Sequence, residues 1–111
     1  DVWIQSELGI VPENGSILAA ITSITKIQPI IIGKPNSPMI EIALSDPDIK
    51  RDFAVIIGDN LDTDIAAANS IGLRSILLLT GVTNSKTAET SAIKASWIAK
   101  DYKALEAILF S

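Results

Sequence analysis

Two carboxylates and a lysine follow apolar segments of this chain at spacings that suit phosphate chemistry. Asp59 comes directly after the apolar run that ends at Gly58, and Asp64 follows five residues later. Lys34 comes after a second apolar run, residues 30–32. Buried strands of open α/β sheets present ligand-binding groups at their carboxyl ends. The two acids and the cation therefore suggest a magnesium and phosphate site.

Asp59 and Asp64 must be weighed against simpler structural roles. Asp59 alone would serve as the cap of a helix that we predict from residue 61. Asp64 falls in the first turn of that helix, so its carboxylate can point back toward Asp59. Two converging carboxylates repel each other unless a cation lies between them. Mg²⁺ binds through one or two carboxylates plus water and phosphate oxygens, whereas a calcium loop would need a Gly and a Glu that are missing here.

Lys34 has two interpretations, an exposed lysine in a turn or a positive charge for a phosphoryl group. Gly33 before it allows a close backbone approach, and Ser37 and Pro38 are typical of a helix start close behind. The dinucleotide-binding and P-loop glycine patterns are absent from the sequence, so phosphate binding would be of another kind.

The other polar and aromatic candidates favour structural roles. Thr80 and Gly81 end a predicted strand and are typical of a polar turn. Trp3, Trp97 and Tyr102 are predicted to pack against apolar neighbours rather than to stack on a ligand.

Composition narrows the chemistry further. The 111 residues include no His and no Cys, carry a formal net charge of −4 and are 48% hydrophobic. Chemistry must then use carboxylates, lysines, hydroxyls and backbone amides, and a metal would be a hard cation with oxygen ligands. Scattered basic residues and short apolar runs argue against nucleic acid and membrane partners, so we expect a cytoplasmic protein.

Alternating elements predict the architecture. We expect a loop with a short strand in residues 1–12, helices at 14–26, 38–44, 61–71, 85–94 and 102–110, and strands at 30–32, 53–57, 74–80 and 97–99. Strands separated by helices form right-handed βαβ units. The expected fold class is therefore α/β, a Rossmann-like three-layer αβα arrangement with a parallel sheet.

The motifs together resemble the haloacid dehalogenase (HAD) superfamily, and more closely its NagD and 4-nitrophenylphosphatase branch. The resemblance covers about residues 12–110 and rests on Gly-Lys-Pro at 33–35, Gly-Asp-Asn-Leu-Asp-Thr-Asp at 58–64 and Leu-Thr-Gly-Val at 79–82. It implies a partial HAD core domain.

The resemblance also implies roles for four residues. Lys34 would steady the phosphoryl group and a nucleophilic aspartate, and Asp59 would be a ligand of Mg²⁺. Asp64 would support the metal through water or hydrogen bonds, and Asn60 would line the site.

The family's nucleophile lies in an N-terminal Asp-x-Asp-Gly motif, which this sequence lacks. Residues 1–14 resemble the end of the family's cap domain, with Asp1 as a candidate for its substrate loop, and residues 15–111 the C-terminal part of the hydrolase core. We therefore expect part of a Mg²⁺-dependent phosphatase for small phosphorylated metabolites, acting through a phospho-aspartate formed upstream of this chain. The chain alone would be inactive and would associate with the missing N-terminal half or with further copies of itself.

Two other readings are a non-catalytic Rossmann-like fragment or subunit that binds Mg²⁺ or phosphate, and a receiver-like signalling domain. The order of residues argues against the receiver, because Lys34 precedes both acids.

Overall fold

The computed structural model describes residues 2–110, and their contacts divide the chain into two compact units. One unit ends at Ile31 and the other begins at Ile32. This division does not coincide with the expected boundary between residues 14 and 15, because the helix after that boundary packs on the strands before it. Whether the first unit belongs to a cap domain stays a prediction.

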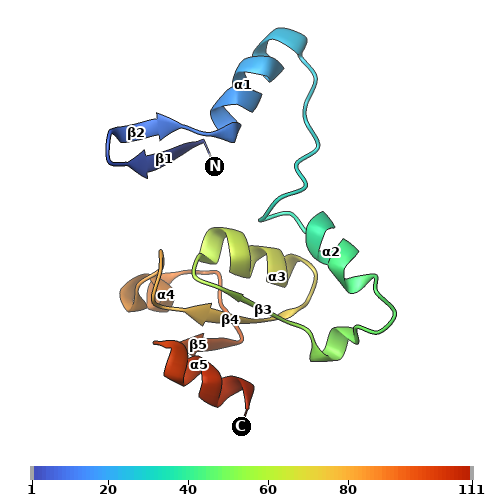
Figure 1. Cartoon of the computed structure of the whole chain (residues 1–111), viewed down its shortest axis with the longest axis vertical. Coiled ribbons are helices and arrows are strands. Elements are labelled where there is room, and N and C mark those ends of the chain that lie inside the picture. The colour runs from blue at the N-terminus through green and yellow to red at the C-terminus, as the bar shows by residue number, and fades with distance from the viewer. Residues whose placement is uncertain (1, 111) are drawn as a thin grey trace. The chain divides into compact units, whose positions relative to one another are not determined.

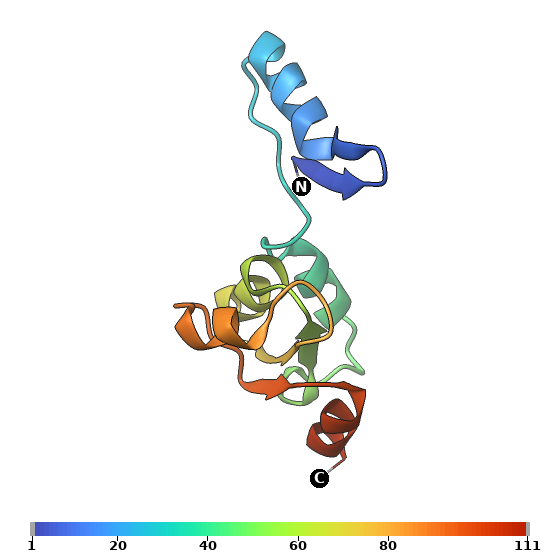
Figure 2. The same ribbon diagram turned by 90° about the vertical axis from the view of Figure 1, so that its left-hand side faces the viewer.

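The first unit is a β-hairpin followed by a helix (Figures 1 and 2). Strands β1 (Trp3–Ser6) and β2 (Gly9–Pro12) pair antiparallel, and helix α1 (Asn14–Thr25) follows. The short strand expected in residues 1–12 is present as β1, but the loop expected around it was wrong. A second strand forms there because Gly9 adopts a φ of 99° beside the turn and Pro12 is the last residue of its strand.

The second unit contains the parallel sheet that the alternating pattern predicts. Its strands β3 (Val55–Gly58), β4 (Arg74–Leu78) and β5 (Trp97–Ala99) lie in that order, and both pairings are parallel. The carboxyl ends of all three strands therefore reach one edge of the sheet.

Helices cover both faces of this sheet (Figure 1). A short π-helix, η2 (Leu61–Ile65), continues into α3 (Ala66–Ser70), and α4 (Ser85–Thr90) lies on the same face. Helix α5 (Tyr102–Leu109) packs on the opposite face. The three-layer αβα arrangement is confirmed. Among residues 2–110, no helix has the length and apolar character needed to cross a membrane.

Leu77 of β4 lies in the core between the sheet and the helices η2 and α4, and its truncation should be destabilising. It is 1% exposed and packs with Leu61, Ile65 and Ala88. We expect Leu77→Ala to lower the free energy of unfolding by about 2–5 kcal/mol, measured by urea denaturation. Leu8→Ala is the matched control, since Leu8 is 93% exposed and its truncation should change stability little. Equal losses for the two variants would contradict this assignment of the core.

The predicted buried strand at residues 30–32 was wrong. Ile30, Ile31 and Ile32 are exposed, and neither sheet of the described residues includes them. A strand is stable only where a neighbouring strand accepts and donates its backbone hydrogen bonds. No such neighbour is present within residues 2–110, so this apolar run is extended coil.

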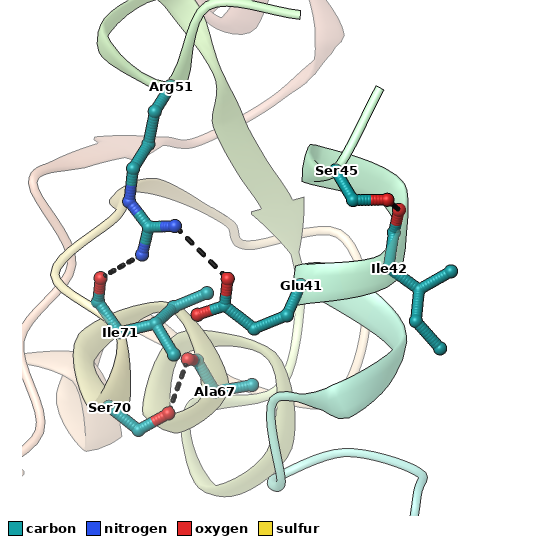
Figure 3. A network of polar contacts seen from close by, with 7 residues as sticks. All are labelled: Glu41, Ile42, Ser45, Arg51, Ala67, Ser70 and Ile71. Atoms are coloured by element: carbon teal, nitrogen blue, oxygen red, sulfur yellow. Dashed lines mark hydrogen bonds and ion pairs between the residues drawn. The ribbon is translucent and has the colours of Figure 1, made fainter. Parts of the chain in front are cut away.

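Helix α2 (Pro38–Leu44) has the bounds that the sequence predicts and is tied to α3 by one side chain. Arg51 donates to Glu41 Oε2 at 3.2 Å and to the carbonyl of Ile71 at 2.5 Å (Figure 3). The same figure shows Ser45 and Ser70 bonded to carbonyls of their own helices. Arg51 thus holds the segment that follows Lys34 against the end of α3.

Candidate active site

Asp59 leaves the carboxyl end of β3 and is held by the loop that follows β4. Its Oδ2 accepts a hydrogen bond of 2.7 Å from the backbone N–H of Val82, and its carbonyl accepts one of 3.0 Å from Thr83. Its other carboxylate oxygen, Oδ1, makes no hydrogen bond with any described residue. One oxygen is therefore fixed by the protein and the other is available to a ligand.

Asn60, and not Asp59, caps the following helix. Its side-chain Oδ1 accepts the N–H of Asp62 at 2.9 Å, and its carbonyl accepts the N–H of Asp64. The helix-cap alternative for Asp59 was thus wrong, because the chain turns one residue later than that alternative requires. Whether Asn60 also contacts a ligand stays a prediction.

Asp64 points back toward the sheet edge, as its position in the first helical turn predicts. It is 5% exposed, and its Oδ2 accepts the backbone N–H of Asn60 at 3.1 Å. Its Oδ1 lies 2.5 Å from Nζ of Lys34. Both oxygens are therefore engaged by protein donors, which suits support of the site better than direct coordination.

Lys34 reaches this edge although the strand predicted before it is absent. Its side chain is 51% exposed, whereas the Asp64 side chain is 8% exposed. The buried carboxylate orients the ammonium, and the exposed part of the ammonium keeps N–H donors for a second anion.

The donor atoms fit a hard cation. Asp59 Oδ1 is an anionic oxygen, and Mg²⁺ typically takes one or two carboxylates and fills its remaining positions with water and substrate oxygens. No group of three or more acidic side chains meets anywhere in residues 2–110, so a closed all-protein metal cage is not formed there. The structure suits an open site centred on Asp59.

A pocket of about 410 Å³ opens beside Asp59. Its wall is mostly apolar and comes from β3, β4 and α5, with Ile57, Leu78 and Leu105 among the lining residues. Tyr102 also lines it and is exposed, as are Trp3 and Trp97, and the packing roles expected for these three aromatic residues stay predictions.

Gly81, Val82 and Thr83 are the site residues that sequence reasoning undervalued. The turn at Thr80 and Gly81 is confirmed, as is its place at the end of the strand beside β3, but the contacts of this loop with Asp59 were not predicted. Its position after a parallel strand was the available signal, because that places it at the same sheet edge as Asp59.

Gly58 is required by the closeness of Asp64. A Cβ at this position would overlap the Asp64 side chain, which is buried and held by two donors. We expect Gly58→Ala to lower the free energy of unfolding by about 1–3 kcal/mol in a urea titration. Gly33→Ala is the control, since nothing lies within 4 Å of a Cβ there. A Gly58 variant as stable as the control would contradict this packing.

Comparison with known proteins gives a consistent result. Residues 31–105 match the family model described as HAD-hydrolase-like. The chain is 39% identical over 85 residues to the D-glycerol 3-phosphate phosphatase of Mycobacterium tuberculosis, covering 77% of this chain and 24% of that protein. It is 37% identical over 90 residues to the ribonucleotide monophosphatase NagD of Escherichia coli, covering 81% and 36% respectively.

Solved structures show the same likeness. A 4-nitrophenylphosphatase from Thermotoga maritima aligns with a TM-score of 0.85 at 32% identity, covering 98% of this chain and 42% of that one. The glycerol phosphate phosphatase of Mycobacterium tuberculosis, solved in complex with magnesium, aligns with a TM-score of 0.80 at 34% identity, covering 95% and 32%. The chain thus spans between a quarter and about two fifths of the length of these relatives. The matched family model covers most of the chain, including Lys34, Asp59 and Asp64, and the chain therefore belongs to the HAD-hydrolase-like family.

Proposed function

We propose that this chain is the C-terminal part of a Mg²⁺-dependent phosphatase that hydrolyses small phosphomonoesters. The observation that carries the proposal is the state of Asp59, whose Oδ2 is bound by Val82 N–H while Oδ1 makes no hydrogen bond within residues 2–110. A carboxylate held in this way is oriented before a cation arrives. The names of the relatives, which are phosphatases acting on glycerol phosphate, nucleotides and nitrophenyl phosphate, favour a phosphate ester as substrate.

Each site residue has a role in this proposal. Asp59 holds the metal through Oδ1, and Asp64 supports the site by orienting Lys34 and the backbone of Asn60. Lys34 presents its ammonium to the phosphoryl group. When bound, Mg²⁺ would supply positive charge beside the phosphoryl oxygens.

The reaction needs a nucleophile that this chain does not supply. An aspartate from a segment outside the chain would attack phosphorus while the ester P–O bond breaks, and the leaving oxygen would take a proton from water to depart as the alcohol. A second water would then cleave the phospho-aspartate, giving inorganic phosphate and the free aspartate. The apolar wall of the pocket beside Asp59 suits contact with such a protein segment better than contact with a charged phosphate.

A chimera tests the proposal. The segment of Escherichia coli NagD that this chain matches is replaced by this chain, and hydrolysis of 4-nitrophenyl phosphate is measured with and without MgCl₂. We expect Mg²⁺-dependent turnover by the chimera and none by the isolated 111-residue chain. The circular dichroism spectrum of each protein verifies that it is folded.

Two results would contradict the proposal. Mg²⁺-dependent turnover by the isolated chain would show that no external aspartate is needed. A folded chimera that binds Mg²⁺ but has no activity would favour the non-catalytic alternative, in which this chain is a Mg²⁺- or phosphate-binding module.

A further inference from the structure

The loop after β4 surrounds Asp59 with three consecutive residues. Gly81 lies so close that a Cβ there would overlap the Asp59 carboxylate. Val82 donates its N–H to Asp59 Oδ2, and Thr83 donates its N–H to the Asp59 carbonyl. The orientation of Asp59 therefore depends on where this loop is held.

Thr83 is the residue that holds the loop. Of residues 80–84 it alone is buried, with 4% of its surface exposed. Its hydroxyl accepts a long hydrogen bond of 3.4 Å from the N–H of Leu61, the first residue of η2. Thr83 thus joins the loop to both the backbone of Asp59 and the helix that follows it.

We propose that Thr83 is a positioning residue that holds the loop against Asp59, so that Val82 occupies Oδ2 and Oδ1 remains available to the metal. The inference rests on the proposed function, because it takes Asp59 as the Mg²⁺ ligand. Outer groups of this kind commonly change metal affinity by about 10–100-fold when they are removed.

The Thr83 hydroxyl should affect the order of Asp59 because the loop residues that contact the Asp59 carboxylate are exposed. Gly81 and Val82 are exposed, whereas Thr83 is buried. Without the Thr83 hydroxyl, Leu61 N–H loses its partner and the loop loses one of its three hydrogen bonds to residues 59–61. The Val82 hydrogen bond then forms for a smaller fraction of the time, and Asp59 must be ordered when Mg²⁺ binds.

The test is a Mg²⁺ titration of the full chain, followed by backbone amide NMR, with MgCl₂ as the only added ligand. Thr83→Val keeps the shape of the side chain and removes the hydroxyl, and we expect it to weaken Mg²⁺ binding by about 10-fold. Thr83→Ser keeps the hydroxyl and should restore affinity to near that of the natural sequence. Thr90→Val is the matched control, because Thr90 is an exposed residue of α4 whose hydroxyl bonds only to carbonyls of its own helix.

Gly81→Ala provides a second variant that leaves the buried Thr83 unchanged. Gly81 is exposed and its φ lies outside the left-handed region, so alanine suits the backbone, but the new methyl group displaces the Asp59 carboxylate. We expect a loss of Mg²⁺ affinity comparable to that of Thr83→Val, with little change in melting temperature. This variant tests whether the loop controls the Asp59 carboxylate, and unchanged Mg²⁺ affinity would overturn the inference even if Thr83→Val does not fold.

Asp59→Asn separates failure of this inference from failure of the proposed function. If Asp59→Asn abolishes Mg²⁺ binding while Thr83→Val and Gly81→Ala bind as the natural sequence does, the positioning role is overturned and the metal site stands. A lower melting temperature with unchanged affinity would likewise reduce Thr83 to a fold-stabilising residue. If Asp59→Asn itself leaves Mg²⁺ binding unchanged, the proposed function is overturned and this inference with it.

Discussion

Replacing Asp59 by asparagine should strongly lower the Mg²⁺-dependent activity of the chimera. The amide keeps one oxygen that accepts the Val82 N–H, so its NH₂ group takes the place of Oδ1 and repels a cation. The site also loses the negative charge that attracts the metal. We expect kcat/KM for 4-nitrophenyl phosphate to fall at least about 100-fold, measured at saturating MgCl₂.

The fold should survive this change. Asparagine has nearly the shape of aspartate, and the Val82 and Thr83 hydrogen bonds can both form. The free energy of unfolding of the isolated chain should therefore change by no more than surface substitutions usually produce, about 0.5 kcal/mol. Asp48→Asn, at an exposed turn outside the site, is the control and should keep full activity. Retention of activity by Asp59→Asn would show that Asp59 is not a metal ligand.

Local sequence signals predicted most elements because tertiary contacts agree with them. The strand at residues 97–99 and the helix at 38–44 have the predicted bounds. Gly72, predicted to end the helix that includes α3, adopts a φ of 68°. These elements carry their own start and stop residues and need little from distant parts of the chain.

The predictions that failed concern segments whose structure depends on contacts with another part of the protein. The triple isoleucine at residues 30–32 has strong strand propensity, but a strand needs a neighbour, which the sequence pattern alone does not supply. The strand that begins at Arg74 ends at Leu78, two residues before the predicted end, because the chain turns at Leu79 and Thr80.

The sequence predicted that the two acids and the lysine lie together, but not which carboxylate oxygens the protein itself occupies. Sequence spacing brought Asp59, Asp64 and Lys34 to one edge. That Asp64 has both oxygens engaged, while Asp59 has one available, follows from amides of Asn60 and Val82. Every residue but proline has a backbone N–H, so no residue type signals such a contact.

Lys34→Met should separate the two tasks of this lysine. Methionine has a similar length but no charge, so the phosphoryl group loses a cation and the buried Asp64 carboxylate loses its ion-pair partner. We expect kcat of the chimera to fall about 100-fold. The loss of stability should be smaller than the roughly 3–5 kcal/mol typical of a fully buried pair, because Lys34 is half exposed. Lys100→Met, at an exposed lysine, is the control for loss of a positive charge.

Combining Lys34→Met with Asp64→Asn distinguishes a phosphate-binding lysine from one that only neutralises Asp64. The double variant removes both charges of the pair, so its free energy of unfolding should recover toward that of the natural sequence. Its kcat should stay low, because no cation remains to meet the phosphoryl group. If activity recovers together with stability, Lys34 serves only to compensate the buried carboxylate. If stability recovers alone and the single variant Asp64→Asn keeps its activity, the exposed side of the Lys34 ammonium is a part of the phosphate site.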